Sequence, residues 1–199
     1  SRGVIRADDA LSFVTAFGRV QRLLASNDVR EMRDPEADVI QVESYIPGTE
    51  YALEGVLEHG VLRTLAIFDK PGHSEGPYFE ESIYVTPSQQ PALAQASLAA
   101  MLRASARALG LTHGPVHAEF RLNEDGPWVL EISPRPIGGL CSRALRFGLE
   151  KIFLEELLVR HALGLPGSDL PRERDASGVM MIPVPRGGIL EGVGGEAAA

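Results

Sequence analysis

The feature that most constrains the fold of this chain is a pair of strand-like segments, residues 115–123 and 128–133, joined by Glu124-Asp125-Gly126. Polar and apolar residues alternate along the first segment, and successive side chains of a strand point to opposite faces. A glycine at the end of such a turn is typical of a three-residue hairpin loop with a bulge. The segments therefore predict an antiparallel hairpin with two unlike faces. The apolar face holds Ala118, Phe120 and Leu122, and the charged face holds His117, Glu119 and Arg121.

The return segment carries a second carboxylate, Glu131, on the face that Val129 and Ser133 are expected to share. A three-residue loop centred on Asp125 places Glu131 opposite Glu119. Like charges directly opposite each other destabilise a sheet unless they are exposed, share a proton or bind a cation. Carboxylate oxygens suit Mg²⁺ that carries nucleotide phosphates. The pair thus predicts a metal site, although two unrelated glutamates on a solvated strand face would give the same spacing.

An arginine between two prolines follows the second carboxylate, in the sequence Ser133-Pro134-Arg135-Pro136-Ile137-Gly138-Gly139. The guanidinium of Arg135 presents a fork of donors that can bind phosphate or carboxylate at two points. An isolated Pro-Arg-Pro sequence is more often an ordinary turn, but its place beside two carboxylates favours a phosphate-binding role. Two further arginines, Arg143 and Arg146, follow in a segment that we expect to be helical.

The rest of the chain predicts helices interleaved with strands. Leu98, Leu102 and Leu109 predict the buried stripe of a long Ala-rich helix, which Gly110 ends. Helices are expected after Asp8 or Asp9, after Pro87-Ser88 and, with a break at Gly148, over residues 145–165; strands are expected at 39–46, 50–57, 61–68, 82–86 and 178–185. These elements predict an α+β fold with an antiparallel sheet flanked by helices.

Composition excludes several classes of protein. The 199 residues carry a formal net charge of −8 without a run rich in Lys or Arg, so the chain has no electrostatic footprint for nucleic acid. No apolar stretch approaches the roughly 20 residues that a membrane-spanning helix needs. Cys141 is the only cysteine, which excludes an intrachain disulfide and a thiolate zinc cluster. We therefore expect a cytoplasmic protein that binds neither nucleic acid nor a membrane.

Two short sequences, Ala118-Glu119-Phe120-Arg121 and Leu130-Glu131-Ile132-Ser133-Pro134-Arg135, resemble the closing signature of ATP-grasp ligases. The resemblance implies the C-terminal part of the ATP-grasp fold, with ATP and Mg²⁺, or Mn²⁺ in its place, as cofactors. It implies that Glu119 and Glu131 hold the metal ions on ATP and that Arg135 is the catalytic contact to the transferring phosphate. Many relatives have Asn where Ser133 stands, so a third metal ligand here could only be a hydroxyl oxygen.

The stretch from Gln41 to Glu50 contains a Pro-Gly turn and, on physical grounds alone, predicts only a hairpin. It is similar to the adenine hinge of ATP-grasp enzymes. The resemblance assigns Glu50 to the ribose hydroxyls and assigns the adenine edge to Glu43, Ser44, Tyr45 and Ile46.

The same resemblance divides the chain into residues 1–47, the end of a first ATP-grasp subdomain, and residues 48–199, a second subdomain with the metal hairpin. Ser1-Arg2-Gly3-Val4 resembles the end of a phosphate-covering glycine loop. The rest of that loop, a lysine upstream of it and the N-terminal lobe lie outside these 199 residues. We therefore expect this chain by itself to be inactive.

The stretch from Asp69 to Glu81 resembles the segment that lines the acceptor pocket of ATP-grasp amino-acid ligases and of biotin-carboxylase-like members. Lys70 is a candidate nucleotide contact and His73 a candidate substrate contact, although a solvated loop is the commoner role of such residues. Arg143 and Arg146 lie where family members hold a substrate carboxylate; helix-capping or surface arginines are the alternative.

The resemblance implies an ATP-dependent carboxylate–amine ligase that works through an acyl phosphate. Its partners would be ATP and small carboxylate and amine substrates, and a homodimer is one candidate assembly. The competing hypothesis is a non-catalytic nucleotide-binding module that keeps the ATP-grasp fold.

Overall fold

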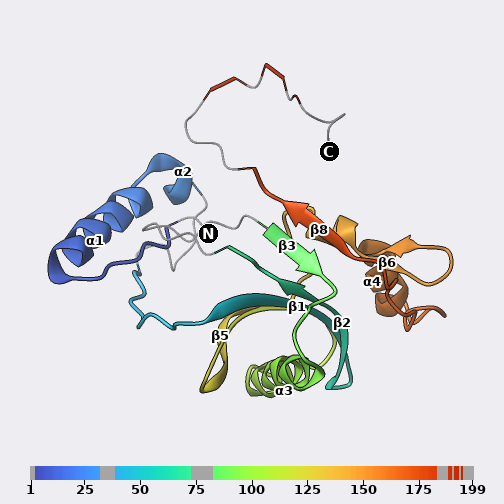
Figure 1. Cartoon of the computed structure of the whole chain (residues 1–199). Coiled ribbons are helices and arrows are strands. Elements are labelled where there is room, and N and C mark those ends of the chain that lie inside the picture. The colour runs from blue at the N-terminus through green and yellow to red at the C-terminus, as the bar shows by residue number, and fades with distance from the viewer. Residues whose placement is uncertain are drawn as a thin grey trace.

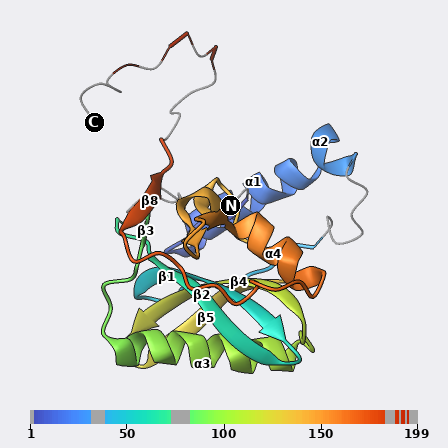
Figure 2. The same ribbon diagram turned by 90° about the vertical axis from the view of Figure 1, so that its right-hand side faces the viewer.

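The computed structural model describes residues 3–31, 39–72, 83–182, 188–189, 191–192 and 194. A six-stranded antiparallel sheet, in the order β5-β4-β1-β2-β3-β8, forms its centre. Helix α3 covers one face of the sheet and helix α4 lies on the other (Figure 1 and Figure 2). The predicted α+β fold with an antiparallel sheet flanked by helices is confirmed.

The elements have the following bounds. The sheet consists of β1 (Thr49–Glu58), β2 (Val61–Asp69), β3 (Ile83–Thr86), β4 (Gly114–Asn123), β5 (Gly126–Ser133) and β8 (Ser177–Met180). The helices are α1 (Ala10–Leu24), α2 (Asn27–Arg30), α3 (Ala92–Ala108), the 3-10 helix η2 (Cys141–Ala144) and α4 (Leu154–Ala162). Strands β6 (Arg146–Phe147) and β7 (Ile152–Phe153) form a separate two-stranded sheet.

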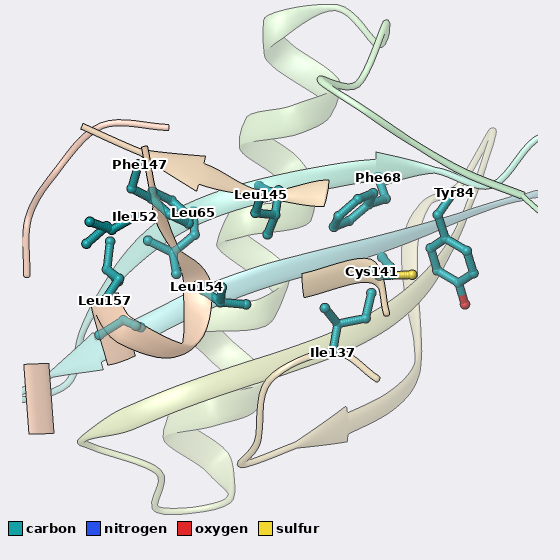
Figure 3. Packing of buried hydrophobic residues seen from close by; sticks show 13 residues of the cluster. Leu65, Phe68, Tyr84, Ile137, Cys141, Leu145, Phe147, Ile152, Leu154 and Leu157 are labelled. Atoms are coloured by element: carbon teal, nitrogen blue, oxygen red, sulfur yellow. The ribbon is translucent and has the colours of Figure 1, made fainter. Parts of the chain in front are cut away.

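Strand β1 lies in the middle of the sheet and is buried on both faces. Leu53 and Leu57 belong to the apolar cluster that packs on α3, whereas Ala52 and Val56 belong to the cluster on the opposite face. The opposite cluster fills the space between the sheet, η2 and α4, as Figure 3 shows. Because both faces are covered, the polar side chains that β1 directs towards η2 are removed from bulk water.

Helix α3 differs in detail from the sequence prediction. It begins at Ala92, five residues after Pro87, and Gly110 follows it with a φ of 72°, as expected for a residue that ends a helix. Leu98 and Leu102 are fully buried, but Leu109 is 60% exposed and Ala106 takes the third place in the stripe. The prediction for Leu109 was wrong because this residue caps the helix, where the chain already leaves the sheet.

The β4–β5 hairpin pairs Glu119 with Glu131 as predicted, but its loop and its bulge differ from the prediction. The loop contains two residues, since Asn123 pairs with Gly126, and the bulge lies further along, where the register shifts between Glu119 and Phe120. Val129 therefore lies opposite Phe120 and packs against the α3 cluster. The prediction that Val129 shares a face with Glu131 was wrong, because the bulge reverses the alternation between them.

Two further segments were assigned wrongly. Residues 39–46 form no strand and pair with none of the strands of the sheet; β1, the next strand along the chain, pairs with β2 on one side and with β4 on the other. The first half of residues 145–165 is the β6–β7 hairpin rather than a helix. Its turn contains Gly148 and Lys151 at φ values of 68° and 52°, which an α-helix does not allow.

Two predictions at the ends of the chain are partly borne out. Asp9 caps α1, where its carboxylate accepts the backbone N–H of Ser12 at 2.7 Å. The final strand, β8, is shorter than expected, and residues 183–187 lie outside the described part of the chain. None of the described helices is long and apolar enough to cross a membrane.

Candidate active site

The charged face of β4 meets a matching face of β1. Arg121 lies directly opposite Glu50 in the antiparallel register, and its Nε and Nη2 donate to the Glu50 carboxylate at 3.1 and 2.6 Å. His117 lies opposite Glu54 in the same register and donates to it through Nδ1. Opposite charges in facing positions stabilise a strand pair. The third position of the row is different: Glu119 faces Ala52, so its carboxylate is free to bind groups from other elements.

Lys70 occupies the space beside Glu119. It follows the end of β2, and its Nζ lies 3.2 Å from a carboxylate oxygen of Glu50 and 3.2 Å from Oε1 of Glu119. Burial opposes the charged ammonium, but the two carboxylates outweigh it and raise the pKa of Lys70. The sequence predicted Lys70 as a nucleotide contact; the structure places it between the proposed ribose-binding and metal-binding carboxylates.

Glu119 is the most strongly stabilised anion of this group. The Tyr84 hydroxyl donates to its Oε1 at 3.3 Å, and Nε2 of His117 lies 3.8 Å from the same atom. Burial disfavours the carboxylate, but His117 and Lys70 outweigh it and lower the pKa of Glu119 to about 2. In turn, Glu119 and Glu54 outweigh burial and raise the pKa of His117 to about 9. Glu119 is therefore ionised, and ready to bind a cation, at any physiological pH.

Glu131 lies opposite Glu119 across the hairpin, as predicted. The Ser133 hydroxyl donates to Oε1 of Glu131 at 2.8 Å, and Nη2 of Arg135 lies 3.6 Å from the same oxygen. In the described part of the chain, no three His, Cys, Asp or Glu side chains converge on one point. Two carboxylates nevertheless suit Mg²⁺, which usually keeps several waters and binds through one or two carboxylates and substrate phosphates.

A cavity of about 160 Å³ brings the predicted groups together. The residues that line it are of two kinds, charged or polar residues and small or apolar ones. The first kind comprises Tyr84, His117, Glu119, Glu131 and Arg135, and the second comprises Ile137, Gly138, Gly139, Cys141 and Met181. Both glutamates thus face one cavity, with an arginine at its rim, which is an arrangement that can bind a metal–phosphate group.

The hinge segment, residues 39–48, reaches this site through side chains of β4. Nη1 of Arg121 donates to the Ile46 carbonyl at 2.5 Å, and the guanidinium lies 4.7 Å from the ring centroid of Tyr45. Asn123 donates to the Pro47 carbonyl at 2.9 Å. Tyr45, Ile46 and Glu50 are therefore held together, whereas Glu43 and Ser44 are exposed. Sequence reasoning gave no role to Arg121; its position two residues after Glu119 on one strand face was the available signal.

Two of the predicted substrate residues, Arg143 and Arg146, are not among the described residues that line the cavity. Arg146 donates to the carbonyl oxygens of Arg143 and Leu145 at 2.5 and 2.9 Å, and its guanidinium lies 3.7 Å from the ring centroid of Phe153. Arg143 is exposed. His73 lies outside the described residues, so its role stays a prediction.

Comparison with known proteins identifies the family. Residues 1–144 match the family model of the ATP-grasp domain. The chain belongs to the ATP-grasp family. It is 37% identical to carnosine synthase 1 of Gallus gallus over 155 residues, which cover 74% of the chain and 16% of that protein.

Solved structures show the same fold. The chain matches the L-amino acid ligase from Bacillus licheniformis with a TM-score of 0.70 and 29% identity, over 92% of the chain and 45% of the ligase. It matches the phosphoribosylglycinamide synthetase from Anaerococcus prevotii with a TM-score of 0.59 and 13% identity, over 88% and 42%. The chain thus spans less than half the length of these relatives. The resemblance to ATP-grasp ligases drawn from the two short sequences is confirmed.

Proposed function

We propose that the chain forms the ATP- and Mg²⁺-binding portion of a carboxylate–amine ligase that works through an acyl phosphate. The observation that carries the proposal is the paired Glu119 and Glu131 at one cavity, with Lys70 linking Glu119 to Glu50. Together with the hinge segment at one end and Arg135 at the other, these residues form one continuous row. It matches the order of groups in ATP, from adenine and ribose to the phosphates. In this proposal the two ATP-grasp subdomains meet near residues 47 and 48.

Each group then has a defined task. The backbone of Tyr45 and Ile46 faces adenine, the Glu50 carboxylate binds the ribose hydroxyls, and Lys70 neutralises phosphate charge. Glu119 and Glu131 would hold Mg²⁺, which supplies charge neutralisation on the phosphate oxygens. Arg135, which lines the cavity, stabilises the γ-phosphoryl group as it passes from ATP to the substrate carboxylate and ADP leaves. The amine then displaces phosphate from the acyl carbon.

Catalysis of this kind depends on position and charge rather than on a side-chain nucleophile. The one cysteine of the chain, Cys141, agrees with that view, because it is buried and its Sγ lies 4.0 Å from the Gly139 carbonyl oxygen. Arg143 and Arg146 remain proposed contacts for a substrate carboxylate. To bind substrate, Arg146 would have to release the carbonyl oxygens of Arg143 and Leu145.

A direct test is nucleotide consumption by the full-length protein with pairs of amino acids. We expect ADP release that requires Mg²⁺, a carboxylate substrate and an amine together. Hydroxylamine should replace the amine and give a hydroxamate, because it traps an acyl phosphate. ADP release without hydroxamate would contradict the acyl-phosphate route, and absence of ADP release with every pair would contradict the ligase proposal.

One observation favours a second candidate, a nucleotide-binding module without turnover. The Ser133 hydroxyl donates its hydrogen to Glu131, so it stabilises that carboxylate in the absence of metal. A module of this kind would bind ATP with Mg²⁺ and release no ADP. The same assay, combined with calorimetric titration of ATP, separates the two candidates.

A further inference from the structure

Glu54 is a buried carboxylate at the centre of the sheet for which the proposed mechanism has no use. It lies on β1, and only 1% of its surface is exposed. A carboxylate removed from water is costly unless hydrogen bonds compensate for the lost hydration. Both of its oxygens are engaged: Oε1 accepts from Nδ1 of His117, and Oε2 accepts the backbone N–H of Ile137 at 3.1 Å. Glu54 therefore joins three parts of the chain that are distant in sequence.

The first contact acts on the metal-binding strand. His117 is itself buried and lies two residues before Glu119 on β4. Because Nδ1 donates to Glu54, the imidazole ring has one orientation, and its Nε2 points towards Glu119 with 3.8 Å between Nε2 and Oε1. A histidine that is oriented by a carboxylate through one nitrogen presents the other nitrogen in a defined direction.

The second contact acts on the loop that follows Arg135. Ile137 is a buried residue of the core layer in Figure 3 and lines the cavity beside Gly138. It is separated from Arg135 only by Pro136, whose φ is restricted by its ring. Holding the amide of Ile137 therefore limits where the backbone of Arg135 can lie. The Arg135 side chain is exposed, so few packing contacts hold it in place.

We propose that Glu54 is a positioning residue that sets the spacing between the metal carboxylate Glu119 and the phosphate-binding Arg135. This inference rests on the proposed function, since it takes both residues to act on one phosphoryl group. A misplacement of about 1 Å can reduce a rate by roughly a hundredfold when catalysis depends on orientation. Glu54 would act through His117 and Ile137 without touching a substrate. It is therefore a residue whose loss should reduce kcat more than nucleotide affinity.

The test uses two variants of Glu54 and one control in the full-length protein. Glu54→Leu removes both hydrogen bonds, whereas Glu54→Gln can still accept from Ile137 and donate to a neutral His117. Leu53→Val is the control, because it trims a core residue of the same strand on the opposite face. We expect kcat to fall at least about tenfold in Glu54→Leu and about two- to fivefold in Glu54→Gln, at a temperature where all variants are folded. Hydrogen exchange of residues 134–140 should rise in Glu54→Leu and stay unchanged in the control.

A second measurement separates positioning from a general loss of stability. If Glu54 acts by placing Arg135, the effects of Glu54→Leu and Arg135→Lys on kcat should be less than additive in the double variant. The inference is overturned if kcat of Glu54→Leu stays within about twofold of the Leu53→Val control, or if the two effects add fully. If the wild-type protein releases no ADP with any substrate, the proposed function fails instead. Hydrogen exchange of residues 134–140 then decides, and an exchange rate in Glu54→Leu equal to that of the control overturns the inference.

Discussion

The β4–β5 hairpin and the hinge segment carry the two ends of the proposed nucleotide site, and they are held in different ways. Strand β4 pairs through its backbone with β1 on one side and β5 on the other, so the positions of Glu119 and Glu131 follow from the register. The hinge segment has no strand partner among the described residues. Arg121 and Asn123 hold it instead, through the carbonyl oxygens of Ile46 and Pro47.

This difference predicts that single substitutions have different effects in the hairpin and in the hinge segment. A backbone ladder tolerates a change of one side chain, so the hairpin should keep its geometry when a carboxylate is removed and lose only the chemistry. The hinge segment depends on side chains of β4, so one substitution there should alter its geometry. The metal end and the adenine end of the site should therefore fail in different ways.

The largest effect is expected at the metal end. Glu131→Gln in the full-length protein should reduce Mg²⁺-dependent ADP release at least about a hundredfold, because it removes a charge from the proposed metal pair. Glu131 is exposed, so the free energy of unfolding should change by no more than about 0.5 kcal/mol. Glu124→Gln, an exposed change in the loop of the same hairpin, is the matched control. A parallel loss of stability in Glu131→Gln would mean that this residue is structural.

A comparison of this chain with the full-length protein should show the next largest effect. The chain matches less than half the length of its relatives of known structure, and its Lys70 is already paired with Glu50 and Glu119, so we propose that the full-length protein supplies further phosphate contacts. Each charge-assisted hydrogen bond contributes about 1.5–3 kcal/mol, and about 1.4 kcal/mol corresponds to a tenfold change in affinity. We therefore expect the 199-residue chain to bind ATP with Mg²⁺ a few powers of ten more weakly in calorimetric titration. Micromolar binding by the chain would contradict this expectation, and ADP production by it would contradict its predicted inactivity.

At the adenine end, Arg121→Lys keeps the charge and removes the fork that holds Glu50 and Ile46 together. ATP affinity in the full-length protein should fall about tenfold, and the free energy of unfolding should fall by about 1–3 kcal/mol, because the Glu50 carboxylate and the Ile46 carbonyl lose hydrogen-bond donors. The Mg²⁺ concentration that gives half-maximal activity should change little. Calorimetry measures the ATP affinity, urea unfolding measures the free energy of unfolding, and Mg²⁺ titration measures the third quantity.

The exposed Arg107→Lys on α3 is the control for Arg121→Lys and should change none of these three quantities. If Arg121→Lys reduced Mg²⁺-dependent ADP release as much as Glu131→Gln does, the metal end and the adenine end would not be separate, and the contrast between them would be wrong.

The pairing of Glu119 with Glu131 could be predicted because alternation along a strand and loop length are local properties. Even there, two errors cancelled: the loop is one residue shorter than predicted, and a bulge further along restores the register. Hinge residues Tyr45 and Ile46 were found through a resemblance, but their expected strand was wrong, since an alternating sequence does not show whether a partner strand has a free edge.

Other parts of the site depend on contacts between distant segments. Lys70 meets Glu119 across 49 positions, and Glu54 meets Ile137 across 83. Glu54 stands among apolar residues of β1, where its neighbours predict a core strand and nothing indicates a partner. Only the packing of η2 and α4 over that face creates a buried environment in which a carboxylate must be compensated.

The smallest effect concerns pH and again separates the two ends. The pKa of His117 is raised from 6.5 to about 9, so its protonated form stabilises the folded state fully below pH 6.5, and this contribution is lost as the pH rises through 9. At the hinge, burial opposes ionisation of Glu50, but Arg121 and Lys70 outweigh it and lower the pKa of Glu50, so this carboxylate stays ionised over the same range. Between pH 6 and 10, the free energy of unfolding should therefore fall by up to about 3 kcal/mol, since one pKa unit corresponds to about 1.4 kcal/mol. The loss should come from the β1–β4 contact at the metal end and not from the hinge.

Urea unfolding of the chain at several pH values measures this slope. His117→Gln should be less stable at pH 6 and should show a much flatter dependence on pH, because the titrating imidazole is gone. His59→Gln, which changes an exposed histidine in the β1–β2 turn, should keep the wild-type slope. If His117→Gln and the wild-type chain lose stability in parallel from pH 6 to 10, His117 is not the group that titrates. The contact between Glu54 and His117 would then be held by a neutral imidazole, and the metal end would be no more sensitive to pH than the hinge.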